Sequence, residues 1–273
     1  MQPRGSGMLH MTSIQSLRLQ RAYLDVSGAR WLLFDKSDPV SRATVLQQQL
    51  EAYRRILPVQ IENEDFVVFR NDRASPFVRG FTHGCIAFGD SRALPKVALE
   101  LALRGYALVH ADGEEIADVP LEALAAYDCI YTSHDHWVEG ALPPAVVARV
   151  SFHDDPKLEL PPPNGEPDPL LLGEIERPRN GQIRVNVAAQ RRAMAVVSES
   201  YYPYWRATVD GKPVTLFRLQ YGMMGMPLAP GVHVIELVYE RPVAYAIAGW
   251  LSALTLLGAL ASVWRARRVL KDT

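Results

Sequence analysis

The feature that most constrains this chain is a long uncharged apolar segment close to its C-terminal end. The residues from Val243 to Trp264 read VAYAIAGWLSALTLLGALASVW, and these 22 residues contain neither a charge nor a proline. As an α-helix they extend about 33 Å at roughly 1.5 Å per residue, which matches a hydrocarbon core of about 30 Å. The alternative, a buried helix of a soluble core, usually carries a polar stripe. The sequence therefore predicts a transmembrane helix over 243–264.

The charges on either side of this segment predict its orientation. Four basic residues follow it in the tail 265–273, whereas Arg241 alone stands close before it. By the positive-inside rule, the tail is cytoplasmic and the bulk of the chain is extracytoplasmic. The N-terminal residues contain no apolar stretch of the kind found in secretory signals. Unless the charge rule misleads here, we therefore expect the chain to be the end of a longer polytopic protein.

Composition narrows the class of protein. Of the 273 residues, 48% are hydrophobic and 22% are charged, which is the balance of a globular chain rather than a disordered one. The net charge of -1 gives no electrostatic case for nucleic acid as a partner. The two cysteines, Cys85 and Cys129, lie within apolar runs, and we interpret them as buried free thiols rather than a disulfide.

The region before the apolar segment divides by pattern into several parts. Residues 1–78 form a small mixed α/β segment, with strand patterns at 30–34 and 66–70 and a helical pattern at 42–57. Residues 79–160 alternate between strand and helix patterns, which predicts a small doubly wound, flavodoxin-like α/β unit. Its strands are expected at 85–89, 106–110 and 127–131, and its helices at 90–104 and 120–126.

A proline-rich linker, residues 161–180, leads into a segment with a different periodicity. Over residues 181–240, apolar and polar residues alternate, and Asp210-Gly211 predicts a hairpin turn. This pattern predicts an antiparallel β-sandwich that stands on the membrane helix. The fold class is therefore α+β and multi-domain: an α/β unit, a sandwich and one C-terminal transmembrane helix.

Within the sandwich, the residues resemble a known family. The stretch from Ser198 to Pro213, SESYYPYWRATVDGKP, resembles the C-terminal signature of bacterial YfhO-type membrane proteins, as does MPLAPGVH from Met226 to His233. An earlier stretch, 67–77, resembles the strand, Asn, Ala, Pro-Arg segment of that family, with Arg79 displaced from the expected place. The strong resemblance covers 195–265. The α/β stretch is similar to related membrane proteins named for 6-pyruvoyl-tetrahydropterin synthase.

The resemblance implies a function for the whole assembly. Such families are polytopic and resemble GT-C glycosyltransferases, which transfer sugars from lipid-linked donors outside the cytoplasmic (inner) membrane. Their catalytic acids lie in loops of an N-terminal membrane bundle, which nothing in this chain matches, so no catalytic residue is carried over. The implied partners are the lipid bilayer, a glycan or lipid-linked sugar, and other membrane helices. No cofactor and no metal is expected.

The residues themselves indicate two weak ligand sites. Asp90 and Ser133 follow predicted parallel strands, where open α/β sheets bind ligands, and His134 and His136 stand beside Ser133. Two alternating histidines supply too few ligands for zinc, so a solvated loop is the alternative interpretation.

Tyr202 and Trp205 form the core of the second site, an aromatic run that would offer a sugar-stacking platform. The alternative is that they fill the sandwich core or face lipid headgroups.

Three functional hypotheses follow. The first is a non-catalytic, extracytoplasmic accessory region of a GT-C-like protein of envelope glycan transfer. The second is a membrane-tethered α/β module that binds a ligand or acts as an enzyme at the strand ends. The third is a membrane-anchored structural or interaction module without a ligand.

Overall fold

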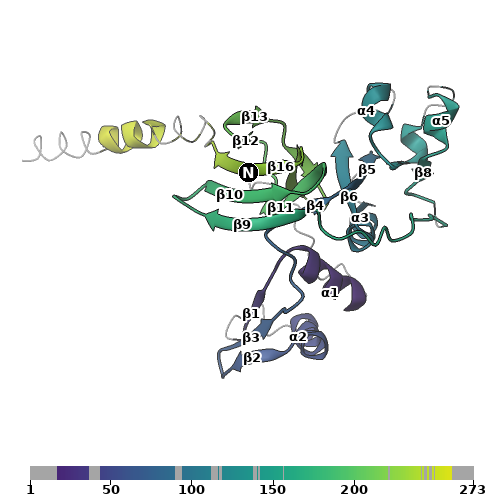
Figure 1. Ribbon diagram of the computed structural model, residues 1–273. Helices are drawn as coiled ribbons and strands as arrows, with labels where there is room; N and C mark the ends of the chain where they lie inside the picture. Colours follow the sequence, from purple (N-terminus) through teal and green to yellow (C-terminus); the bar gives the residue numbers. More distant parts are fainter. Residues whose placement is uncertain are drawn as a thin grey trace, which may run out of the picture.

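The structure is a computed structural model that describes residues 17–36, 44–89, 94–111, 116, 119–137, 140, 142–155, 157–220, 222–240, 242, 245, 248 and 250–259. In these residues the chain forms an α+β fold with sheets of three, five and eight strands. Figure 1 shows a small N-terminal unit, a β-sandwich and an α/β layer that extends from one side of the sandwich.

The N-terminal unit is a three-stranded antiparallel sheet covered by a helix. Its elements are α1 (Leu17–Val26), β1 (Trp31–Asp35), α2 (Thr44–Ile56), β2 (Val59–Glu62) and β3 (Phe66–Arg70), with the strand order β1-β3-β2. Leu50 and Tyr53 on α2 pack against Val67 and Phe69 on β3, and this cluster is the core of the unit. The amphipathic pattern predicted at 42–57 and the strand predicted at 66–70 are both present.

The next strands form a parallel layer inside the eight-stranded sheet. Its elements are β5 (His83–Phe88), α3 (Leu94–Leu103), β6 (Tyr106–Ala111), α4 (Leu121–Ala125), β7 (Cys129–Thr132), the 3-10 turn η3 (His134–His136), α5 (Pro144–Val147) and β8 (Val150–Phe152). The four strands are parallel and lie in the order β6-β5-β7-β8. This is the order of a flavodoxin-like, doubly wound unit.

Helices cover both faces of this parallel layer. Ala87 packs with Leu101 of α3 on one face, whereas Phe88 packs with Leu124 of α4 and Val146 of α5 on the other. Because both faces are buried, β5, β6 and β7 are mostly apolar, which explains why these three strands were predicted from the sequence, whereas the short β8 was not.

Cys85 and Cys129 occupy paired positions on the neighbouring strands β5 and β7, with Cα atoms 4.6 Å apart, and they form a disulfide. Our interpretation of buried free thiols is therefore wrong. The two residues are 44 positions apart, and their proximity arises only when β7 pairs beside β5.

The sandwich consists of two packed sheets. The five-stranded sheet contains β9 (Leu170–Glu176), β10 (Gln182–Ala189), β12 (Trp205–Val209), β13 (Lys212–Val214) and β16 (Gly231–Tyr239), in the order β13-β12-β16-β10-β9. It packs against β4 (Val78–Phe81), β11 (Ala193–Ser200) and β15 (Met223–Leu228). Val185, Ala195, Met226 and Leu237 are buried between the sheets. The predicted hairpin turn is present, with positive φ at Asp210 and Gly211.

One sheet joins the sandwich to the α/β layer. The strands β4, β11, β15 and β14 (Phe217–Leu219) continue directly into β6-β5-β7-β8, so that eight strands lie in one sheet. The junction is a pairing of Leu219 on β14 with Val109 on β6. The regions predicted as 79–160 and 181–240 thus contribute strands to the same sheet, which their separate sequence patterns did not indicate.

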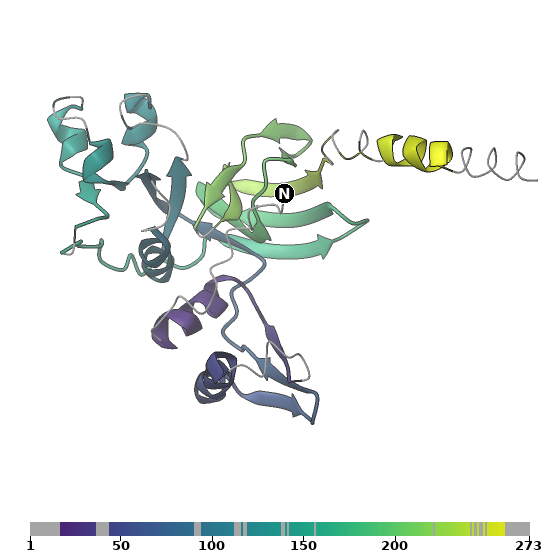
Figure 2. The same cartoon turned by 180° about the vertical axis from the view of Figure 1, so that it is seen from behind.

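Residues 250–259 form a helix that projects away from the sandwich in both views (Figures 1 and 2). Trp250, Leu251, Leu254 and Leu257 in this helix are all exposed. Among the helices in the described part of the chain, none combines the length and the apolar character required to cross a membrane. This finding does not support the predicted transmembrane helix, several residues of which, including all of 260–264, lie outside the described set.

Candidate functional site

The first predicted site lies at the carboxyl edge of the parallel strands. Ser133 follows β7 directly and is buried, and His134 begins η3 with an exposed ring. Asp90 and the side chain of His136 lie outside the described residues. The structure therefore places two of the four predicted residues side by side at the strand ends.

The His134 side chain holds two loops together. Its Nδ1 lies 3.0 Å from Oδ1 of Asp154, and its backbone N–H donates to Oδ2 of the same carboxylate at 3.1 Å. The imidazole ring also stacks on Phe152 with a centroid separation of 4.0 Å. Partial burial opposes ionisation of Asp154, but the hydrogen bonds from His134 lower the pKa of this carboxyl below its ordinary value. The pair thus fixes the loop after β7 to the loop after β8.

The described residues include no group of three or more His, Cys, Asp or Glu side chains placed to hold a metal ion. Nearby, Nε2 of His153 contacts the carbonyl oxygen of Phe88 at 3.3 Å, so this ring is directed at the end of β5. His134, Asp154 and His153 therefore connect the loops that follow β5, β7 and β8.

The second predicted site lies at the end of the sandwich nearest the C-terminal helix. Tyr202 is exposed, whereas Trp205 is half-buried and packs against the sandwich core. Trp205 and Tyr204 both meet the ring of Tyr239 edge-on, with centroids 5.4 Å and 6.2 Å apart. Trp205 thus helps to close the end of the core, whereas Tyr202 and Tyr204 remain exposed, and the sugar-stacking platform stays a prediction.

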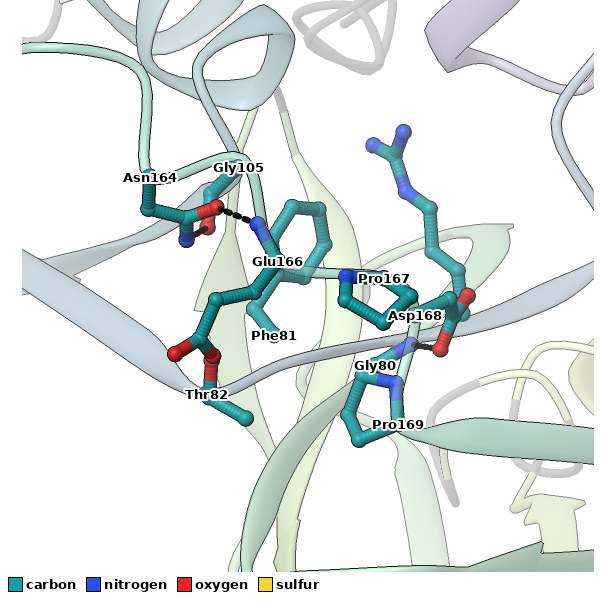
Figure 3. A pocket seen from close by; sticks show the side chains of 10 residues that line it. Gly80, Phe81, Thr82, Gly105, Asn164, Glu166, Pro167, Asp168 and Pro169 are labelled. Carbon is teal, nitrogen blue, oxygen red and sulfur yellow. Dashed lines mark hydrogen bonds between the residues drawn. The ribbon is translucent and has the colours of Figure 1, made fainter.

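A pocket that sequence reasoning missed lies between β4 and the proline-rich linker. It encloses about 170 Å³ and includes Gly80, Thr82, Asn164, Glu166 and Asp168 in its wall. Figure 3 shows that the linker residues reach across to the strand and to the turn at Gly105. Oδ1 of Asp168 accepts from the N–H groups of Gly80 and Leu170, both at 2.8 Å. The hydroxyl of Thr82 donates to Glu166 at 2.6 Å.

The position of β4 explains why the linker binds there. β4 is the edge strand of the eight-stranded sheet, and an edge strand leaves backbone groups unpaired unless another segment covers them. Gly80 allows the close approach, because a Cβ at this position would lie 2.6 Å from Cγ of Leu170 and 2.8 Å from Cγ of Pro169. The linker is therefore a strap along the sheet edge rather than a free tether.

Arg79 is the unusual member of this wall. Its side chain is only 7% exposed, and Nη1 donates to the hydroxyl of Ser75 at 3.3 Å. Its guanidinium lies over the Phe81 ring at 4.9 Å. Burial lowers the pKa of Arg79 to about 10, and the charge of Asp168 acts in the opposite direction. In the sequence, Arg79 was noticed only as a displaced member of a family motif. Its position between apolar residues, in Phe77-Val78-Arg79-Gly80-Phe81, was the feature that could have indicated a buried arginine.

Comparison with known proteins identifies the C-terminal part of the chain. The family model described as bacterial membrane protein YfhO matches residues 174–249. The match begins in β9 and covers the strands from β10 to β16, including Tyr202 and Trp205, but it excludes β4 with Arg79, as well as Ser133 and His134. No curated protein and no solved structure is significantly similar to the chain. The predicted resemblance is confirmed for this part of the chain: residues 174–249 are similar to the bacterial membrane protein family YfhO.

Proposed function

We propose that this chain is the extracytoplasmic, non-catalytic accessory region of a GT-C-like membrane protein that takes part in envelope glycan or lipid-linked sugar transfer. The observation that carries the proposal is the YfhO match over residues 174–249, which covers most of the sandwich. In this role the sandwich and the α/β layer bind or position a glycan or a partner, and the sugar transfer itself takes place in a membrane bundle.

Anchoring by residues 243–264 is supported by their sequence and by exposure. The 22 residues carry no charge, and Trp250, Leu251, Leu254 and Leu257 contact no part of the folded core closely enough to be buried. Leaving such side chains in water costs about 25 cal/mol per Å² of apolar surface, whereas lipid removes this cost. Tyr204 and Tyr245, at the junction with the sandwich, suit the headgroup region.

An extracytoplasmic location of the bulk is supported by two independent features. The Cys85–Cys129 disulfide is of a kind that persists in oxidising compartments. The basic residues after position 264 favour a cytoplasmic tail.

The anchoring is tested with these 273 residues produced by themselves, so that no other membrane segment retains them. The wild-type chain should stay with the membrane fraction after an alkaline wash. A variant with Leu254→Arg and Leu257→Arg should leave it, because each central arginine opposes insertion by about 2.5–3.5 kcal/mol. Leu171→Arg, at an exposed position on β9, is the matched control and should remain in the membrane fraction. Retention of the double variant would contradict the anchor.

Sidedness and role need separate measurements. Protease added to spheroplasts should digest the sandwich of the wild-type chain, and digestion in inverted vesicles alone would place the bulk in the cytoplasm instead. Deletion of the chain should change the sugar composition of the envelope, measured on purified glycan polymers. An unchanged composition would remove the glycan role while leaving the membrane location intact.

A second candidate function, a ligand-binding α/β module, is favoured by the strand order β6-β5-β7-β8. In such sheets the ligand site lies where the strand order reverses, here beside β5 and β7, and Ser133 stands at that point. A panel of soluble hexoses and hexose phosphates should then raise the melting temperature of the full chain. Ser133→Ala should reduce this shift, and absence of any shift would disfavour the module.

A further inference from the structure

We infer that Arg79 anchors a binding site for a small oxyanion, a carboxylate or a phosphate group, on the side of β4 that faces α1. Side chains alternate along a strand, so Arg79 and Phe81 lie on the same face. Phe81 packs with Ala22 and Val26 of α1, whereas Val78 points into the sandwich core. The Arg79 guanidinium therefore extends between the sheet and α1.

The charge of Arg79 is buried without a matching carboxylate. With a pKa of about 10, the guanidinium remains charged at neutral pH. Among the described residues no carboxylate forms a hydrogen bond or an ion pair with it; Asp168 acts only at longer range and already accepts from Gly80 and Leu170. A buried charge is costly unless it is paired. An anionic ligand would supply the missing partner.

The unpaired atoms have the geometry that an oxyanion requires. Nη1 of Arg79 is engaged by Ser75, whereas Nε and Nη2 are buried and have no hydrogen-bond partner. These two nitrogens share one edge of the planar guanidinium, and their N–H bonds are parallel. Two parallel N–H donors match the two oxygens of a carboxylate or phosphate. The free edge of Arg79 is therefore a preformed bidentate fork.

A further unpaired group lies on the same face. Val196 on β11 is the register partner of Arg79, and Ser198 stands two residues further along that strand. The Ser198 hydroxyl is buried without a partner and is available as an additional donor. The end of α1 approaches this region closely, because a Cβ at Gly28 would lie 3.1 Å from the carbonyl oxygen of Ser75 and 3.3 Å from Oγ of Ser198.

Arg79 belongs to the wall of the pocket of about 170 Å³ beside β4, and a ligand that enters there reaches Nε and Nη2 by displacing the groups that bury them. The two acidic residues of that wall already have hydrogen-bond partners, and one of them is paired with an arginine. Glu166 accepts from Thr82 and pairs with Arg191 at 3.1 Å, and Asp168 accepts two backbone N–H groups.

The test uses thermal unfolding of the full chain in detergent, in chloride, phosphate or acetate at matched ionic strength. Phosphate or acetate should raise the wild-type melting temperature in a saturable manner, and the two anions together tell which oxyanion the site takes. Arg79→Met should abolish the increment. Arg184→Met, which removes an exposed arginine from β10, should keep it. An equal increment in the Arg79→Met variant, or no increment in the wild type, would overturn the inference.

Arg79→Lys keeps the charge but removes the fork, and it serves where the methionine variant does not fold. It should need at least about tenfold more anion for a half-maximal shift, since an ammonium group cannot bind both oxygens in parallel. An unchanged half-maximal concentration would show that the fork is not used. The melting temperatures test the anion site alone. The proposed glycan role is tested by membrane fractionation and envelope composition, so either proposal can fail without the other.

Discussion

The eight-stranded and five-stranded sheets follow different sequence patterns within one molecule. In the eight-stranded sheet both faces are covered, so β5 and β15 are apolar almost throughout. In the five-stranded sheet only the inner face is covered, and β10 alternates between buried and more exposed residues. The comparison shows that periodicity reports how many faces of a strand are buried, and not the sheet to which the strand belongs.

The largest expected effect comes from filling the covered side of β15. A Cβ at Gly225 would lie 1.7 Å from Cδ1 of Leu219 and 2.8 Å from the carbonyl oxygen of Ala195. Gly225→Val should therefore lower the free energy of unfolding by about 3 kcal/mol or more, because overpacking a two-sided core forces backbone shifts. Leu171→Ala, on the outer face of β9, should change it by less than about 0.5 kcal/mol. Denaturant titration of both variants measures the contrast, and similar values would refute it.

The disulfide gives the second largest effect and concerns the parallel layer alone. Joint Cys85→Ala and Cys129→Ala substitution should lower the free energy of unfolding by about 2–3 kcal/mol, because the bond restricts the unfolded chain. A reducing agent should destabilise the wild type and leave the double variant unaffected. Alkylation before reduction should label neither cysteine in wild-type protein isolated from cells. Labelling of both would restore the interpretation of free thiols.

The junction between the two halves of the eight-stranded sheet depends on Gln220. This residue is 1% exposed and has a positive φ of 50°. Its backbone N–H donates to the carbonyl oxygen of Leu108 at 2.8 Å, and its side chain donates to that of Tyr106 at 2.9 Å. Gln220→Ala leaves the Tyr106 carbonyl without this donor and should cost about 1–2 kcal/mol. The exposed Gln190→Ala is the control.

Hydrogen exchange locates the effect of Gln220→Ala. Amides of β14 and β6 should lose protection first, while those of the five-stranded sheet keep theirs. Equal loss of protection in both sheets would show that the junction is not a separable link.

The sequence predicted the local elements better than their assembly. The strand at 66–70 was identified with the bounds that the structure has, because its buried and exposed positions alternate. β2 was missed although its sequence, VQIE, alternates apolar and polar residues, because four residues are too short a run to predict a strand, and all four are exposed. The pairing of Leu219 with Val109 joins residues that are 110 positions apart in the sequence, and no local pattern predicts such a pairing.

The candidate sites show the same division. Ser133 and His134 were placed correctly at the strand ends because a loop after a buried strand is a local feature. The contact of His134 with Asp154 depends on β8 lying beside β7, which the sequence did not indicate. Arg79 shows the limit most clearly, since the unpaired state of its Nε and Nη2 depends on every segment packed around it.

The smallest expected effect concerns the pair of His233 and Asp210 at the hairpin of the five-stranded sheet, called the clamp below. Nδ1 of His233 lies 2.8 Å from Oδ2 of Asp210, and this hydrogen bond raises the pKa of His233 and lowers that of Asp210. The His233 contribution is complete below its unfolded pKa of about 6.5 and disappears as the pH rises through its raised folded value. The Asp210 contribution is present above about pH 4 and disappears as the pH falls through its lowered value.

The clamp should therefore stabilise the hairpin most between about pH 4 and pH 6.5. The melting temperature of His233→Gln should fall below that of the wild type in this window, and the gap should narrow as the solution becomes alkaline. Arg184→Gln removes a neighbouring pair on the same sheet, in which Arg184 lies 3.6 Å from Glu236. Because arginine does not titrate near neutrality, the difference in melting temperature between Arg184→Gln and the wild type should stay constant as the solution becomes alkaline. A constant gap for His233→Gln would show that the charged form of the imidazole contributes nothing to this exposed face.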